Sequence, residues 1–563
     1  MPSFLKHHKL ILLIWLMSVP LKLFVAQNMP WDIDIVPVVA RNAQYTLTPV
    51  GTLASVAAYN LPMLEWLHLP AQWLTGDVWW TIVLTLLTIN LLGTLAIYGL
   101  GRSMFSQRVG LVAGILFTFS EVGVSSSYTA WAQLLLPAFF AMTLYTLWLW
   151  VKHEKGYWLA LSGIIATVAF MTHFSAVLLY PTMLAFAIVT RAKWQWNWLI
   201  IGAIIIGLLF TPYILFQIER DFIDARAFIT QEPLVSNATL AQYESYKIEY
   251  RSLETPTDTD NTQSVAPSLP VEPSPPIVRP RWQRAIDYAL EAPIWYWRAM
   301  TTAFITQTRA INLAIPQLAP ITRTFLTLQH VLLVVSISTA LFHYLRNFKK
   351  QKSLTATPSG RLLLVTGFLT VYIAIMLLTR TIDNSSYWMG FMSIQYLILA
   401  YAISLVPEQN RIINAIAVIL LIAYVGLQTT ERSLRIIQHD DSQFSAFNVS
   451  IYRHVEATVD YIAEDWDSDA VTISYDILPI MPNLWWVPAW HTIDPFYTMG
   501  MNFDFLLSYH HGIDNTNTDP VGTIQPELAD YIVIYTPRQD QYDLTQYSVQ
   551  QFGTILVLKP LSP

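Results

Sequence analysis

Apolar runs that recur along most of the chain limit its fold more than any other feature. A helix needs about 20 predominantly apolar residues to cross roughly 30 Å of hydrocarbon. Eleven runs reach or approach this length, over residues 10–27, 79–99, 109–124, 132–151, 157–172, 174–190, 197–217, 326–345, 362–379, 388–405 and 412–428. No small-residue cleavage site follows the first run, so it is expected to remain as an anchor. The pattern predicts a polytopic α-helical membrane protein with about eleven spans.

The charge content agrees with this class. Only 12% of the residues are charged, whereas a soluble domain usually carries about 25%. Lys and Arg are also divided unevenly between the two alternating sets of short loops, with 14 in one set and only Arg41 and Arg380 in the other. Because positively charged loops stay in the cytoplasm, the amino terminus is predicted inside and the carboxyl terminus outside.

Three segments are then expected on the outer face: residues 28–78, residues 218–325 and everything after about residue 430. The second segment contains an insert, about 252–280, that is rich in Pro, Ser, Thr and acids and is expected to be disordered. Its two ends mix aromatic and charged residues at helical spacing, which is typical of helices lying in the membrane interface. We therefore divide the chain into a membrane domain, 1–430, and an outer domain, 431–563.

The outer domain differs in composition from the rest of the chain. It holds 18 acidic against 5 basic residues. The stretches "VTISYDI", "DYIVIYT" and "GTILVLK" have the pattern of strands, and "VSIYRHVEATVDYIAEDW" has the three- and four-residue spacing of a helix. A small α/β domain is predicted. Its aromatic stretch "PNLWWVPAWHTIDPFYTMGMNFDF" fits either a groove for sugar or lipid or an ordinary packed core.

Two acids, Asp32 and Asp34, follow the first apolar run at the predicted outer surface. One interpretation is that "WDID" caps a helix that begins at the following apolar residues. The other is that one carboxylate acts as a general base, with a pKa raised by burial near lipid. Cysteine is absent from the whole chain, so disulfides and thiolate metal sites are excluded. No His-rich ligand pattern is present, and no metal or other cofactor is predicted.

Several motifs occur in a characteristic order. An acid after the first span is followed by Ala40, Arg41 and the turn "TPVGT", and then by "YNLPMLEWLHLPAQWLTGD", "SQRVGLVAGILFTFS", "WAQLLLP", "MTHFSAVLLYP", "TPYILFQIERDF" and "NSSYWMGFMSIQYLILAYAI". Together they resemble the GT-C membrane glycosyltransferases, and more narrowly the bacterial branch related to protein mannosyltransferases and aminoarabinose transferases. The resemblance covers roughly residues 1–430. The chain departs from the pattern where Ile33 follows Asp32 and where Gln217 stands in place of a frequent acid.

The resemblance implies a GT-C fold in the cell membrane, with the active site and outer domain extracytoplasmic. It also implies transfer of a hexosyl- or pentosyl-type sugar, with inversion, from a polyprenyl-phosphate donor to a lipid, glycan or protein acceptor. Some relatives use a divalent cation, which is not predicted here, and nothing indicates a nucleic-acid partner. Asp32 is the first candidate for the base, because its spacing to Arg41 matches the family, and Asp34 is the second.

The remaining candidates are substrate-binding residues on the predicted outer face. Arg41 and Arg380 would hold the departing phosphate through forked contacts, although Arg380 could also be a side chain that reaches from a helix end to the interface. His173 would donate to phosphate or acceptor, or serve as a structural histidine. Glu219 and Arg220 would help to close the site, or form a solvated cluster, and Tyr387 lies in the aromatic helix that resembles the family.

Three other functions fit parts of the pattern. A lipid-linked glycan flippase or other transporter would be expected to show internal repeats and broken helices, which the sequence lacks. An O-antigen type polymerase or ligase would be expected to place Arg and His in its large outer loop, whereas here acids directly follow the first span. The third is a structural or interaction protein in which the acidic outer domain acts on a scaffold that has lost catalysis.

Overall fold

The computed structural model describes most of the membrane helices and parts of the carboxyl-terminal region. The described residues are 2–28, 38–39, 41–42, 47–52, 59–127, 130–230, 319–347, 353–379, 390, 392–405, 411–438, 452–476, 501–517, 528–535, 539, 542–553 and 555–561. Asp32, Asp34, Arg380, Tyr387 and the insert at 252–280 lie outside these ranges, and so does most of the aromatic stretch after residue 476.

Five described helices are long and apolar enough to cross a membrane by length and composition. They belong to α1 (Pro2–Asn28), α4 (Val78–Met104), α7 (Ala132–His153), α10 (Trp196–Glu219) and α15 (Pro358–Thr379). The other predicted runs coincide with apolar helices of which only shorter stretches meet this test: α5 (Gln107–Phe119), α8 (Gly156–Thr172), η1 (Phe174–Leu178) with α9 (Leu179–Thr190), α14 (Ala319–Arg346), α16 (Met392–Ser404) and α17 (Arg411–Gln438). The chain is a multi-pass membrane protein, and its number of spans and its orientation stay predictions.

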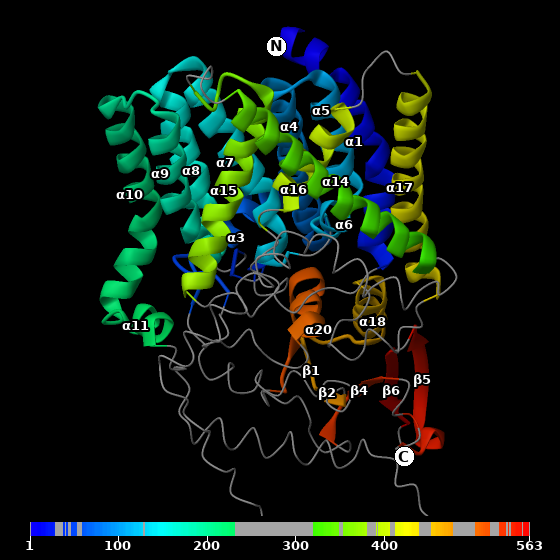
Figure 1. The fold of residues 1–563 in the computed structure, drawn as a ribbon. Coiled ribbons are helices and arrows are strands. Elements are labelled where there is room, and N and C mark those ends of the chain that lie inside the picture. The colour runs from blue at the N-terminus through cyan, green and yellow to red at the C-terminus, as the bar shows by residue number, and fades with distance from the viewer. Residues whose placement is uncertain are drawn as a thin grey trace, which may run out of the picture.

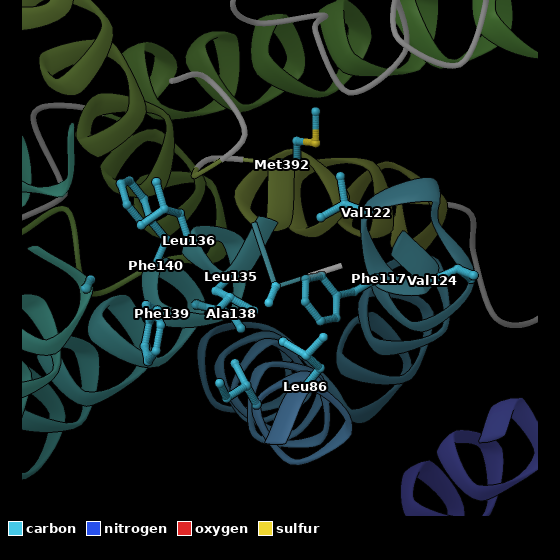
Figure 2. Packing of buried hydrophobic residues seen from close by; sticks show 14 of the residues in the cluster. Leu86, Phe117, Val122, Val124, Leu135, Leu136, Ala138, Phe139, Phe140 and Met392 are labelled. Atoms are coloured by element: carbon cyan, nitrogen blue, oxygen red, sulfur yellow. The ribbon is translucent and has the colours of Figure 1, made fainter. Parts of the chain in front are cut away.

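The bundle is held by close approaches between α4 and its neighbours. A Cβ atom on Gly93 of α4 would lie 2.7 Å from the Ala138 Cβ of α7, and one on Gly101 would lie 2.9 Å from the Cα of Gly110 in α5. Small residues at such contacts let helix backbones approach closely, which drives association where lipid removes the hydrophobic effect. Leu86, Phe117 and Leu135 then fill the space between these helices (Figure 2).

The outer surface of the bundle is apolar where it would meet lipid. Of the residues in α10, only Gly202, Tyr213 and Gln217 are buried, and Ile200, Ile204 and Leu208 are among its exposed side chains. Such exposure would cause aggregation in water but is expected of a helix facing acyl chains.

Helix α5 is shorter than the helices that flank it. Its 13 residues extend about 20 Å at 1.5 Å per residue, less than the roughly 30 Å of hydrocarbon. The helix ends at Phe119, and the chain then forms α6 (Glu121–Ser125), which is followed by α7. Residues 120–127, which we call the mid-membrane segment, therefore lie within the thickness of the bundle, because the Gly123 carbonyl accepts from Asn90 Nδ2 near the middle of α4. Figure 1 shows α6 on the side of the bundle that faces the sheet.

The carboxyl-terminal region forms a sheet on the side of the bundle opposite the amino terminus (Figure 1). The strand order is β2 (Ile473–Asp476), β4 (Tyr531–Tyr535), β6 (Ile555–Pro560) and β5 (Tyr547–Phe552), with β2 and β4 parallel and the other pairs antiparallel. A second pair joins β1 (Ala470–Val471) to β3 (Asp514–Asn515). Strands β2, β4 and β6 and helix α18 (Tyr452–Asp465) coincide with the stretches predicted as strands and helix, whereas β3 and β5 were not predicted.

Residues alternate across this sheet as strand geometry requires. Val533 and Val557 join the cluster that contains Val459 of α18, whereas Ile532 and Leu558 form a separate cluster on the other face. Helices α20 (Met501–Leu506) and η9 (Leu507–His511) follow in the sequence. The Tyr509 hydroxyl of η9 donates to the Gly76 carbonyl at 3.2 Å, which links this region to the membrane domain.

Candidate functional site

Two arginines from distant parts of the sequence face one aromatic ring. The Cζ atoms of Arg41 and Arg220 each lie 5.7 Å from the centroid of the Tyr59 ring. Arg220 also lies 5.2 Å from the ring of Phe216, which meets Tyr59 edge to face at 5.9 Å. Cation–π contacts of this kind hold guanidinium groups in place while leaving their N–H donors directed elsewhere. Two predicted substrate-binding residues, Arg41 and Arg220, are therefore brought together.

A sharp turn after α10 builds one half of this site. Asp221 and Phe222 both have left-handed backbone angles, with φ of 51° and 54°, which non-glycine residues rarely adopt. The turn leads into α11 (Ile223–Thr230), whose second residue, Asp224, is buried. Asp224 accepts from Gln217 Nε2 at 2.8 Å and from the Tyr59 backbone N–H at 3.3 Å. The turn thus fixes the end of α10 against the segment that begins at Tyr59.

Asp224 is also the anionic partner of Arg220. The Nε atom of Arg220 lies 3.3 Å from Asp224 Oδ2, and 36% of the Arg220 side chain is exposed while Asp224 is fully buried. Arg220 can therefore turn its remaining donors towards a ligand without leaving the carboxylate. The Tyr213 hydroxyl donates to the Tyr59 carbonyl at 3.3 Å and completes the contact with α10.

The other half comes from α3 (Met63–Thr75), the amphipathic run predicted in the first outer loop. Glu65 is fully buried on this helix, and its Oε1 lies 3.5 Å from Nη1 of Arg41, which is only 3% exposed. The side-chain amide of Asn42 donates to the Glu65 carbonyl at 2.8 Å. A Cβ on Gly51 would lie 3.0 Å from Glu65 Oε2, so this glycine lets the preceding loop pass close to the carboxylate.

Further polar side chains share the buried face of α3. His68 and Gln72 follow Glu65 at spacings of three and seven, and both are buried. The Nδ1 N–H of His68 donates to the Leu64 carbonyl at 2.7 Å. Burial lowers the pKa of His68 to about 4, so the ring is neutral at physiological pH and presents Nε2 as an acceptor.

His173 and Glu219 differ from the two arginines in their surroundings. His173 caps η1, where its Nδ1 accepts the Ser175 N–H at 3.3 Å and lies 2.8 Å from the Ser175 hydroxyl. The Tyr372 hydroxyl of α15 donates to the Ser175 carbonyl at 2.8 Å. Burial lowers the pKa of His173 to about 4. These contacts fit the structural interpretation of this histidine, whereas Glu219 is exposed at the end of α10. Their proposed roles in substrate binding stay predictions.

Sequence reasoning missed Tyr59, Glu65 and Asp224. Two of them carried a signal: Glu65 interrupts the apolar face of "MLEWLHLPAQWL" at the spacing of His68 and Gln72, and Asp224 lies four residues after Arg220. Tyr59 gave no signal, because its contacts form only between segments that are far apart in the sequence. Among the residues that the structure describes, no group of three or more His, Cys, Asp or Glu side chains is arranged to hold a metal ion.

These features define a multi-pass helical membrane protein with a charged, aromatic-lined site formed by the first loop and the end of α10. The family model for dolichyl-phosphate-mannose-protein mannosyltransferases matches residues 59–216 of this chain. That match begins at Tyr59 and ends at Phe216, the two aromatic residues that contact Arg220. The resemblance to GT-C glycosyltransferases of the protein mannosyltransferase type is confirmed over this part of the chain.

Distant likenesses to solved structures cover nearly the whole chain. ArnT from Cupriavidus metallidurans bound to undecaprenyl phosphate is 12% identical with a TM-score of 0.42, over 100% of this chain and 98% of that one. Archaeal oligosaccharyltransferase AglB from Archaeoglobus fulgidus, in complex with an inhibitory peptide and a dolichol-phosphate, is 11% identical with a TM-score of 0.45, over 98% and 74%. No curated protein matches the chain.

Proposed function

We propose that the protein transfers a sugar from a polyprenyl-phosphate donor to an acceptor hydroxyl on the outer face of the membrane. The acceptor oxygen attacks the anomeric carbon, the bond from that carbon to the phosphate oxygen breaks, and the phosphate leaves with the bonding electrons. The acceptor proton passes to the carboxylate of Asp32, with Asp34 as the second candidate. Attack from the face opposite the phosphate inverts the anomeric centre.

The observation that carries the proposal is the convergence of Arg41 and Arg220 on Tyr59, at the start of the segment that matches the mannosyltransferase model. A departing lipid phosphate needs cationic donors that are already in place, because charge develops on its oxygens as the bond breaks. Arg220 is the partly exposed member of the pair and supplies N–H groups suited to phosphate oxygens. Asp32 and Asp34 lie seven to nine positions before Arg41 in the sequence.

The two arginines have different parts in this mechanism. Arg41 is buried against Glu65 and follows Asp32 by nine positions in the sequence, so we assign it the role of positioning the base. Arg220 is held by Asp224 and faces the ligand. Arg380 and Tyr387, which precede α16, are retained as further substrate-binding residues, and His173 and Glu219 are retained beside them. The acceptor is a lipid, glycan or protein hydroxyl.

The test is transfer from radiolabelled polyprenyl-phosphate sugars by the purified full chain in the presence of a membrane extract. Asp32→Asn and Asp34→Asn are compared with Glu154→Gln, a matched change to an exposed carboxylate that follows α7 and is paired with Lys193 at 3.6 Å. Loss of a general base costs about 10²- to 10⁴-fold in rate, so one of the two Asn variants is expected to fall by this amount while Glu154→Gln is unchanged. Equal transfer by all three variants would remove the base assignment. Translocation of the donor without transfer would favour the transporter.

A further inference from the structure

A lysine is buried inside the membrane bundle, and no carboxylate of the described residues forms an ion pair with it. Lys22 of α1 is fully buried. Its ammonium donates to Asn90 Oδ1 of α4 at 2.5 Å and lies 5.6 Å from the ring centroid of Trp15. An ionisable side chain in this environment is costly and usually has a specific task. The mechanism proposed above makes no use of it.

The task follows from what Asn90 does with its other atoms. Its Oδ1 accepts from Trp15 Nε1 at 3.0 Å as well as from Lys22, so both lone pairs are used. Its Nδ2 donates to the Gly123 carbonyl at 2.8 Å and to Ser126 Oγ at 3.2 Å. If the Asn90 amide were flipped, its NH₂ group would face the Lys22 ammonium and the Trp15 indole N–H. All of these groups are donors, so no hydrogen bond could form between them. Lys22 therefore locks the amide so that its donors face the mid-membrane segment.

The mid-membrane segment needs the fixed Asn90 donors because its backbone leaves the helix inside the bundle. Backbone that leaves a helix inside the hydrocarbon layer must have its polar groups satisfied by protein or by a water-filled cavity. Asn90 supplies the donor for the Gly123 carbonyl, and Ser127 Oγ donates to the same carbonyl at 3.1 Å. Any Cβ on Gly123 would overlap the Phe117 carbonyl, so only glycine fits at this position of the segment. Val122 and Val124 fix its apolar side in the core (Figure 2).

We propose that Lys22 and Asn90 are positioning residues for the transfer reaction, and that they hold the mid-membrane segment at a fixed depth. This inference rests on the proposed function for its link to turnover, but the depth of the segment can be measured by itself. The segment opens with Ser120, directly after α5, and its helix α6 packs against α7. A shift of the segment would change how α6 packs against α7.

Asn90→Asp separates positioning from folding. The aspartate keeps both acceptor bonds and gains an opposite charge for Lys22, which supports the fold. It also replaces the NH₂ group by an oxygen that repels the Gly123 carbonyl, which displaces the segment. Lys22→Met removes the charged donor and leaves only Trp15 to orient the amide. The matched control is Thr94→Val, one turn along α4 from Asn90, which removes a 3.2 Å hydroxyl contact with Thr118 of α5 and no hydrogen bond to the segment.

Because the chain has no cysteine, a single Ser125→Cys substitution gives a unique thiol on α6. Labelling of this thiol with a membrane-impermeant maleimide is measured on the full chain in detergent, beside its melting temperature. We expect Asn90→Asp to raise the labelling rate about tenfold, as the loss of one net hydrogen bond allows, with an unchanged melting temperature. Lys22→Met is expected to raise the rate by less, and Thr94→Val to leave it unchanged.

Turnover is measured on the same variants. Asn90→Asp is expected to lower kcat about tenfold while KM for the donor stays within twofold, the split expected when an interaction made only in the transition state is lost. Equal labelling of Asn90→Asp and Thr94→Val would overturn the inference, and equal labelling of wild type and Lys22→Met would remove Lys22 from it. A large fall in melting temperature for Asn90→Asp would show a purely structural role. If wild type transfers no sugar, the proposed function fails, and the labelling result still decides the depth of the segment.

Discussion

A half-buried carboxyl group in the carboxyl-terminal sheet region makes the stability of this region depend on pH. Asp504 of α20 accepts from the Tyr475 hydroxyl at 2.5 Å and from Asn515 Nδ2 at 2.8 Å. Burial nevertheless raises the pKa of Asp504 from 3.8 to about 6, because desolvation outweighs the two hydrogen bonds. The proximity of this carboxylate, together with burial, raises the pKa of Tyr475 as well. At neutral pH the fold must therefore keep an ionised carboxylate where a neutral group would be more stable.

The sign and size of the effect follow from linkage. The folded state binds the proton more tightly than the unfolded state, so stability is greatest at low pH and is lost as pH rises from 3.8 to about 6. The full loss corresponds to about 3 kcal/mol at 1.36 kcal/mol per pKa unit. Between pH 5 and pH 7.5 the expected loss is about 1.4 kcal/mol, or about tenfold in the opening equilibrium.

Asp504→Asn tests this reasoning, because an asparagine oxygen can accept both hydrogen bonds without carrying a charge. Since the side chain is only partly shielded from solvent, we expect a gain of about 2 kcal/mol at pH 7.5 rather than the full amount. The assay is hydrogen exchange of the β2 and β4 amides in the full chain, corrected for the intrinsic exchange rate at each pH. Protection should rise about 30-fold in the variant and lose its dependence on pH. Protection in wild type that does not change between pH 5 and pH 7.5, or that falls in Asp504→Asn, would refute the argument.

Three further predictions concern the membrane domain. Arg41→Met leaves the Glu65 charge buried without its guanidinium, so unfolding should become easier by about 3–5 kcal/mol; the added Glu65→Gln change should restore part of this loss, measured by melting in detergent. Arg220→Gln should weaken binding of a fluorescent polyprenyl phosphate about tenfold, the value of one charge-assisted contact, while Lys193→Gln at the other end of the bundle leaves binding unchanged; equal binding by both variants would contradict the phosphate assignment. Gly93→Leu should lower stability by about 1–3 kcal/mol through overpacking, because even a methyl group would meet Ala138, and a variant that melts like wild type would disprove this close contact.

The sequence predicted the helices of the bundle well because each one depends mainly on its own composition. The run at 197–217, for example, appears as α10 over Trp196–Glu219, since a helix facing lipid must be apolar on every side. The strand at 531–535 was recognisable for a similar reason, because its residues alternate between two buried clusters. The run at 109–124 was predicted as one short span, but the structure ends α5 at Phe119 and begins the separate helix α6 at Glu121. The sequence did not show this break or that the chain after it stays within the bundle. That position depends on Asn90, a single polar residue in an otherwise apolar run.

The site was less predictable than the helices. Arg41 was recognisable as an isolated cation in a short outer loop, and Arg220 as part of a charged cluster at the start of the long loop. Their convergence on Tyr59 depends on how α3 and α10 pack together. Glu65 was not recognisable as the partner of Arg41, since 24 positions separate the two residues in the sequence. Asp32 and Asp34 remain predictions from the sequence. A linear pattern can indicate which charges lie near the surface, but the pairing of charges is a property of the packed structure.

The pairing of each site arginine with a carboxylate affects how tightly a lipid phosphate would bind. Each arginine of the site already faces a fully buried carboxylate, Arg41 with Glu65 and Arg220 with Asp224. A bound phosphate would therefore contact arginines whose charge is already balanced by carboxylates. It would not enter a pocket with an excess of positive charge. Binding then depends on the donors that Arg220 can redirect, while Arg41, being buried, responds mainly through stability. Moderate affinity is an advantage for an enzyme of the proposed kind, because the phosphate lipid is released after each transfer, and a site that bound it too tightly would slow every turnover.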